Sequence, residues 1–169
     1  MRNALYMAIV FVTLIALSCA DDQTQARADW ELITPLTYRD TFVFDFDIQD
    51  TAQSYFLGMD VHFDYVEYPF QNIYFQVDTR YPDGETQKEL LNLDFSDKKG
   101  VIKGECLGTT CELPLYLQRR IHFDQKGAYS IKLVQHTRRD SLPGIQSMSL
   151  VLGAEPFHRV NGASPDRPQ

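Results

Sequence analysis

The clearest structural signal in this chain is the stretch Thr41-Phe42-Val43-Phe44-Asp45-Phe46-Asp47-Ile48. Large apolar side chains occupy every second position of it, and mainly polar ones lie between. Because successive side chains of an extended strand point to opposite faces, this alternation predicts a strand with one buried face. An amphipathic helix would instead place its apolar residues three or four positions apart.

The same period of two recurs through both halves of the chain. No window of about twelve residues shows an apolar stripe at the helical period. Turn residues separate the runs, most clearly at Tyr81-Pro82-Asp83-Gly84, where proline fixes one dihedral angle and glycine accepts a positive one. The further runs are Val61, Phe63 and Tyr65; Ile73, Phe75 and Val77; Leu91, Leu93 and Phe95; Leu113, Leu115 and Leu117; Ile121 and Phe123; Tyr129, Ile131 and Leu133; and Met148, Leu150 and Leu152.

These runs predict an all-β domain of seven or eight strands. An antiparallel β-sandwich is the architecture expected when each strand has one apolar face and short turns connect neighbours. A partly open β-barrel is the alternative, since the same alternation would fill its interior.

The first residues have the plan of a bacterial signal peptide. Met1-Arg2-Asn3 gives a short positive start, and an apolar run of about fourteen residues follows, which is too short to span a bilayer. The run closes at Ala16-Leu17-Ser18-Cys19, which resembles the lipobox of bacterial lipoproteins, with alanine where leucine is usual. That resemblance implies cleavage after residue 18, acylation of Cys19 and attachment to a membrane; an ordinary secreted protein is the alternative.

Four segments follow from composition. Residues 1–18 are the lipoprotein signal peptide. Residues 19–29 are the lipidated N-terminus with a flexible tether, since residues 20–29 contain nothing large and apolar that could be buried. Residues 30–153 are the β-sandwich domain. Residues 154–169 are a disordered tail, because Pro156, Pro165 and Pro168 exclude a regular strand there.

The charge balance argues against a nucleic-acid partner. The whole chain carries a formal charge of −7, and loss of Arg2 with the signal peptide makes the mature chain more acidic still. Binding to phosphates needs a basic stripe, and the chain has only isolated basic pairs.

Cys106 and Cys111 are disulfide candidates, because an exported protein meets oxidising conditions. A metal site is the weaker alternative, since no second pair of ligands stands at zinc-binding spacing. Free thiols are the remaining possibility.

The sequence offers no catalytic or cofactor-binding motif, and we predict that the protein is not an enzyme. It has no Gly-x-Ser-x-Gly turn, no nucleotide-binding glycine loop and no His-Glu-x-x-His motif. A glycosidase needs only two carboxylates that face each other, and the candidates for such a pair are Asp45, Asp47, Asp60 and Asp64. The histidines are isolated and are expected to be ordinary surface or partly buried residues: His62, His122, His136 and His158.

Aromatic residues suggest a second kind of function. Tyr65, Tyr68, Phe70 and Tyr74 could form a sugar-stacking platform, although packing in the core is the simpler interpretation. An acidic pair behind the acylated cysteine, as at Asp21-Asp22, resembles a surface-export signal of Bacteroidota. A surface glycan-binding module of a nutrient-uptake system is therefore the alternative function.

Several segments together resemble the gliding-motility lipoprotein GldH family of Bacteroidota. They are Trp30, the run from Tyr68 to Phe75, the turn at 81–84, Gly127-Ala128-Tyr129-Ser130-Ile131, and Gln135-His136-Thr137-Arg138 followed by Leu142-Pro143-Gly144-Ile145. The resemblance covers the chain from the lipobox to about Leu152. Cys106, Cys111 and the proline-rich tail depart from the family pattern.

The resemblance implies a non-catalytic structural or assembly component of the gliding machinery, linked to type IX secretion. It implies a location in the cell envelope, lipid-anchored in the outer membrane, on either its periplasmic or its surface side. The expected partners are other motility or secretion lipoproteins, and the only residue with an implied role is Cys19.

Overall fold

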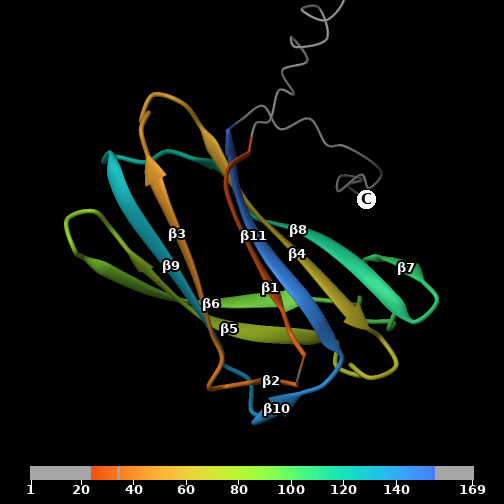
Figure 1. Cartoon of the computed structure of the whole chain (residues 1–169). Coiled ribbons are helices and arrows are strands. Elements are labelled where there is room, and N and C mark those ends of the chain that lie inside the picture. The colour runs from red at the N-terminus through yellow and green to blue at the C-terminus, as the bar shows by residue number, and fades with distance from the viewer. Residues whose placement is uncertain (1–23, 34, 155–169) are drawn as a thin grey trace, which may run out of the picture.

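The computed structural model describes residues 24–33 and 35–154 (Figure 1). These residues form eleven strands, of which eight have eight residues or more. In chain order the strands are β1 (Thr24–Glu31), β2 (Leu36–Thr37), β3 (Thr41–Ile48), β4 (Tyr55–Asp64), β5 (Asn72–Arg80), β6 (Thr86–Asp94), β7 (Glu105–Leu107), β8 (Thr110–Ile121), β9 (Gly127–Gln135), β10 (Ser141–Leu142) and β11 (Ile145–Ala154).

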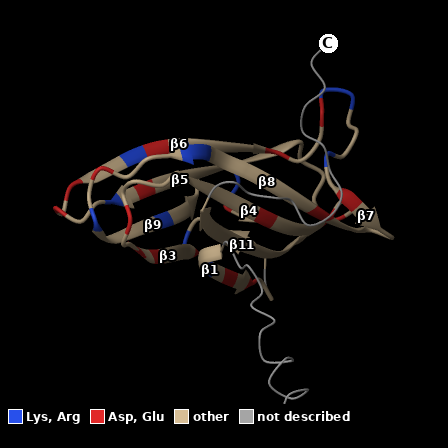
Figure 2. Ribbon diagram, turned by 90° about the horizontal axis from the view of Figure 1, so that it is seen from above, with Lys and Arg blue, Asp and Glu red and all other residues tan. Residues whose placement is uncertain are grey.

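The strands form two main sheets that pack face to face (Figure 2). The first sheet has five strands in the order β1-β11-β4-β8-β7, and the second has four in the order β3-β9-β5-β6. A third pair, β10 and β2, closes one end. Every pairing is antiparallel. The predicted β-sandwich is confirmed, and the sheets do not join into one closed sheet.

The core lies between the two main sheets. Along β3, exposed and buried residues alternate as predicted: Phe44 is 1% exposed, whereas its neighbour Val43 is 45% exposed. Aromatic rings join the layers, since Trp30 of β1 meets Phe42 of β3 edge-on at 5.4 Å between ring centroids. Each large side chain buried in this way contributes about 1.5–3 kcal/mol to folding.

The structure corrects the sequence interpretation at several strand ends. The tether predicted for residues 19–29 is wrong for residues 24–29, because these lie in β1 and pair with β11. Their small side chains still alternate, with Ala26 and Ala28 turned against the core. Tyr65 lies beyond the end of β4 and is exposed, and Phe123 follows the end of β8 rather than forming a strand with Ile121.

The predicted turn at 81–84 connects β5 and β6. Gly84 has a φ of 87°, and its N–H donates to the carbonyl of Tyr81 at 3.0 Å. Asp83 accepts a hydrogen bond from the backbone N–H of Glu85 at 2.9 Å, which holds the turn from its side. This hairpin places β6 at the edge of the four-stranded sheet.

Candidate functional site

The predicted lipidation site lies outside the described residues, whereas the predicted disulfide lies within them. Cys19, the signal peptide and residues 155–169 of the tail lie outside the described residues, while Ala154 is the last residue of β11. Cys106 and Cys111 are joined by a disulfide, which links β7 to the start of β8. This bond braces a hairpin whose tip carries the exposed Leu107.

The four candidate carboxylates do not form a facing pair. Asp45 and Asp47 lie on the outer face of the four-stranded sheet, opposite in phase to the buried phenylalanines of β3. Asp60 lies on the outer face of the other sheet, where it accepts a hydrogen bond from Ser149 at 3.3 Å. The core therefore separates Asp45 and Asp47 from Asp60, and no pair of carboxylates taken from the two strands can face each other.

Asp64, the fourth carboxylate, has a structural role. It accepts hydrogen bonds from the hydroxyl of Thr109 at 2.5 Å and from the backbone N–H of Val66 at 2.8 Å. These bonds, the one from Thr109 above all, hold the pKa of Asp64 below its usual value. The residue thus ties the turn after β4 to the β7–β8 hairpin.

The histidines lie apart from one another. His62 is on the outer face of β4, and the backbone N–H of His136 donates to Tyr74 at 2.8 Å. His158 is outside the described residues. Among residues 24–33 and 35–154, no group of three or more His, Cys, Asp or Glu side chains could hold a metal ion.

The aromatic platform predicted as an alternative does not form. Tyr68 is only 3% exposed and belongs to the core, where its hydroxyl donates to the carbonyl of Asn72 at 2.9 Å. Burial raises the pKa of Tyr68. Phe70 is half-buried against the Tyr68 ring, and Tyr65 and Tyr74 are the exposed members of the set. Since the four rings do not share an exposed face, they offer no continuous stacking surface.

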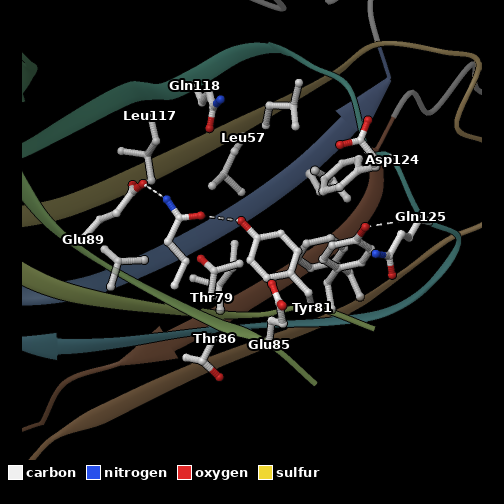
Figure 3. A pocket seen from close by; sticks show the side chains of 18 of the residues that line it. Leu57, Thr79, Tyr81, Glu85, Thr86, Glu89, Leu117, Gln118, Asp124 and Gln125 are labelled. Atoms are coloured by element: carbon white, nitrogen blue, oxygen red, sulfur yellow. Dashed lines mark hydrogen bonds between the residues drawn. The ribbon is translucent and has the colours of Figure 1, made fainter. Parts of the chain in front are cut away.

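The candidate site is a cleft of about 640 Å³ between the two sheets, where β5 and β6 face β4 and β8 (Figure 3). Its floor is apolar and half-buried, and it includes Leu57, Val77, Leu91, Leu117, Ile121 and Phe123. A cleft of this size with an apolar floor can bind side chains of a ligand or partner. We call it the acidic cleft because carboxylates line its rim.

Carboxylates surround the apolar floor. Asp83 and Glu85 come from the β5–β6 hairpin, Glu89 from β6, and Asp124 from the loop after β8. No Lys or Arg is among the described residues that line the cleft. The site therefore combines apolar contact area with four negative charges, a combination that favours a ligand that is both apolar and basic.

Hydrogen bonds hold two of the four carboxylates at the rim, Asp83 and Glu89 (Figure 3). The Tyr81 hydroxyl donates to Oε1 of Gln87 at 2.7 Å, and the Gln87 amide donates to Oε1 of Glu89 at 2.5 Å. Asp83 accepts from the Gln125 amide at 3.0 Å. The backbone N–H of Glu85 and this amide hold the pKa of Asp83 below its usual value.

One contact at the rim has the distance of a nucleophile–base pair. Ser54 Oγ lies 3.2 Å from Nε2 of His122. However, no hydrogen bond joins a carboxylate to His122 among the described residues, and such a partner is what orients the base in serine hydrolases. The Ser54–His122 contact therefore lacks, among the described residues, the third member of that arrangement.

The sequence interpretation missed the acidic cleft, although one signal for it was present. Leu91 and Leu93 were placed on the inner face of their strand, and the same period of two puts Glu89 and Gln87 on that face as well. Polar residues at inward positions mark a part of the interface that the opposite sheet does not cover.

Comparison with known proteins now decides the family. Residues 23–151 match the sequence profile of the GldH lipoproteins. The chain belongs to the GldH lipoprotein family. It is 24% identical over 155 residues to a "Gliding motility lipoprotein GldH homolog" of Christiangramia forsetii, covering 88% of this chain and 91% of that one. It is 23% identical over 142 residues to the "Gliding motility lipoprotein GldH" of Flavobacterium johnsoniae, covering 83% of this chain and 86% of that one.

The structure gives a physical reason for the Leu-Pro-Gly-Ile motif on which the resemblance to the family rested. Leu142 and Ile145 are buried, and Gly144 between them has a φ of 83°. The Gly144 carbonyl accepts a hydrogen bond from the N–H of Asp64 at 2.8 Å. The motif therefore fixes the turn into β11 against the turn after β4.

In the described part of the chain, no helix has the length and apolarity needed to cross a bilayer.

Proposed function

We propose that this protein is a non-catalytic component of the gliding-motility machinery that is anchored in the outer membrane through Cys19 and holds a partner in the acidic cleft. The observation that carries the proposal is the cleft itself, with its apolar floor and four rim carboxylates. Membership of the GldH lipoprotein family, whose relatives bear gliding-motility names, supplies the biological setting.

The proposed anchor rests on the sequence around Cys19. Two or more acyl chains hold a protein stably on a bilayer at about 0.8 kcal/mol per buried methylene, whereas one chain holds it only marginally. A lipobox cysteine acquires several chains, so the anchor is permanent in this proposal. The partners are other motility or secretion lipoproteins of the cell envelope, which include components linked to type IX secretion.

A non-catalytic role is supported by what the described residues offer chemically. The candidate carboxylates are divided between the two outer faces and a turn, and the Ser54–His122 contact has no orienting acid. The rim carboxylates of the cleft, in contrast, are suited to holding a basic group in place.

Gene deletion in a gliding host tests the proposal. Cells without the protein are expected to lose surface spreading and to secrete less type IX cargo, and the native gene should restore both. A Cys19→Ala version should restore neither, because the domain is then no longer held at the membrane. Normal spreading and secretion in the deletion strain would refute the proposal.

A further inference from the structure

The outer edge of β6 has backbone groups that no described strand pairs. In an antiparallel sheet, the N–H and C=O groups of a residue point to the same side, and the side alternates along the strand. The Tyr74 carbonyl accepts a hydrogen bond from the N–H of His136 on the β9 side. The backbone N–H and C=O groups of every second residue of β5, counted from Tyr74, therefore point toward β9 and away from β6. The register partners of these residues on β6 are Lys88, Leu90 and Asn92.

It follows that Lys88, Leu90 and Asn92 direct their N–H and C=O groups away from β5. No described strand lies on that side, because β6 is the last strand of its sheet. Such an edge can accept an additional extended strand, whose main chain would complete the hydrogen bonds. The edge also borders the acidic cleft, which is lined by Glu89 and Leu90 of the same strand.

The charge at this edge selects what can pair with it. Glu89 points toward the cleft and Glu85 immediately precedes β6, so a strand added here would lie beside both carboxylates. A second copy of this chain would bring its own acidic edge, and like charges placed opposite each other destabilise a strand pair. A segment with basic side chains would instead be stabilised.

The floor of the cleft adds a requirement for apolar side chains. Side chains of an added strand alternate between its two faces, and those on the inner face would lie over Leu91 and Leu117. An inner face with basic residues toward Glu85 and apolar residues toward Leu91 would satisfy both the rim and the floor.

We infer that β6 is a docking edge for an extended segment of a partner protein that carries both basic and apolar side chains on its inner face. The inference rests on the proposed function, since it names the chemistry of the partner held in the acidic cleft. The segment adds as a fifth strand beyond β6 and covers the open side of the cleft. A second copy of this chain and an uncharged polysaccharide are the competing occupants.

Synthetic peptides provide the first test. The intact lipoprotein in detergent micelles is titrated with fluorescent Thr-Val-Thr-Val-Thr-Lys-Thr-Lys-Thr, whose lysines lie toward Glu85 when the peptide pairs antiparallel to β6. Binding is measured by fluorescence anisotropy. We expect saturable binding that weakens as salt is raised, and no binding of the peptide in which both lysines are replaced by glutamates. Equal binding of both peptides, or of neither, would refute the inference.

Charge-neutral variants test the rim. Glu85→Gln combined with Glu89→Gln keeps the shape of the rim and removes two charges. The double variant should bind the lysine peptide roughly two- to thirtyfold more weakly, as expected for the loss of two exposed ion pairs. The matched control is Asp45→Asn with Asp47→Asn, which removes two charges from the outer face of β3. If both double variants weaken binding equally, the effect is one of net charge and the inference fails.

Proline at the edge tests the main-chain pairing. Lys88→Pro removes an N–H that points away from β5, so it should abolish binding while leaving the sandwich folded. Lys88→Ala loses the same charge but keeps the N–H, and it should bind at least as well as the native protein. Loss of binding in both variants, or in neither, with the circular dichroism spectrum unchanged, would contradict strand addition.

Spreading assays separate failure of this inference from failure of the proposed function. Loss of spreading in the deletion strain, together with full restoration by the Glu85→Gln and Glu89→Gln double variant, would refute the docking edge alone. Normal spreading in the deletion strain would refute the proposed function. We expect the double variant to restore spreading only in part, and the Asp45→Asn and Asp47→Asn control to restore it fully.

Discussion

Replacing Gly144 by alanine should destabilise the sandwich for two reasons, because both the backbone angle and the space around the residue disfavour a Cβ atom. The residue has a φ of 83°, and a Cβ atom there would lie 2.7 Å from the backbone nitrogen of Tyr68 and 3.0 Å from the carbonyl oxygen of Asp64. Both neighbours are backbone atoms of one turn, so neither can rotate away as the end of a side chain would.

The expected cost has two parts. A positive φ costs a residue with a Cβ atom about 1–2 kcal/mol, and overpacking against fixed atoms adds about 1–3 kcal/mol. The sum is about 2–5 kcal/mol, a large part of the 5–15 kcal/mol by which a typical domain is stable. For a domain of this size that corresponds to a fall in Tm of roughly 6–15 °C.

Gly84 supplies the matched control, because it separates the two parts of the cost. Its φ is 87°, but no heavy atom of the described residues would lie within 4 Å of an added Cβ. Gly84→Ala should therefore cost only about 1–2 kcal/mol. Urea unfolding of both variants in detergent, followed by circular dichroism, measures the difference. If Gly144→Ala is no more destabilised than Gly84→Ala, the steric reasoning about the turn is wrong.

Three further predictions concern the core, the disulfide and pH. Phe44→Ala should lower the free energy of unfolding by about 3–5 kcal/mol in a urea titration, whereas Val43→Ala on the exposed face of the same strand should change it by less than about 1 kcal/mol. Reducing the bond between Cys106 and Cys111 should cost about 2 kcal/mol, because the loop it closes is short; an unchanged urea midpoint under reductant would contradict this. The pKa of Asp64 is lower in the folded state than its usual 3.8, so its contribution to stability is present above that value and is lost as the pH falls through the folded pKa. Asp64→Asn should therefore show a smaller loss of stability between about pH 7 and pH 3 than the native protein, measured as the shift of the urea midpoint.

Period-two patterns predicted the strands because burial between two sheets acts on every second residue. The run from Phe42 to Ile48 shows this most clearly, since every second residue from Phe42 onward is buried and Val43 between them is exposed. The turn at 81–84 was also predictable, because Pro82 and Gly84 restrict the backbone locally.

β1 and the acidic cleft depend on features that local patterns do not carry. Ala26 and Ala28 alternate with charged residues but are too small to give a strong apolar signal, and it is their pairing with β11 that orders the strand. The cleft arises because β6 and β8, which belong to opposite sheets, do not pack against each other over their full length. Such gaps depend on the twist of the two sheets and not on the sequence of either strand alone. The inward positions of Gln87 and Glu89 are the local clue to that opening.

With Cys19 acylated as proposed, the pairing of Thr24 with Gly153 limits how far the folded domain can lie from the membrane. The chain from Cys19 to residue 24 can span no more than about 18 Å, whereas a linker from Cys19 to Trp30 could span about 40 Å. The volume that a tethered domain can occupy grows with the cube of the linker length. The shorter linker therefore raises the local concentration of the domain near the bilayer surface roughly tenfold. A partner that is itself embedded in or attached to that membrane is therefore met far more often than one that diffuses freely.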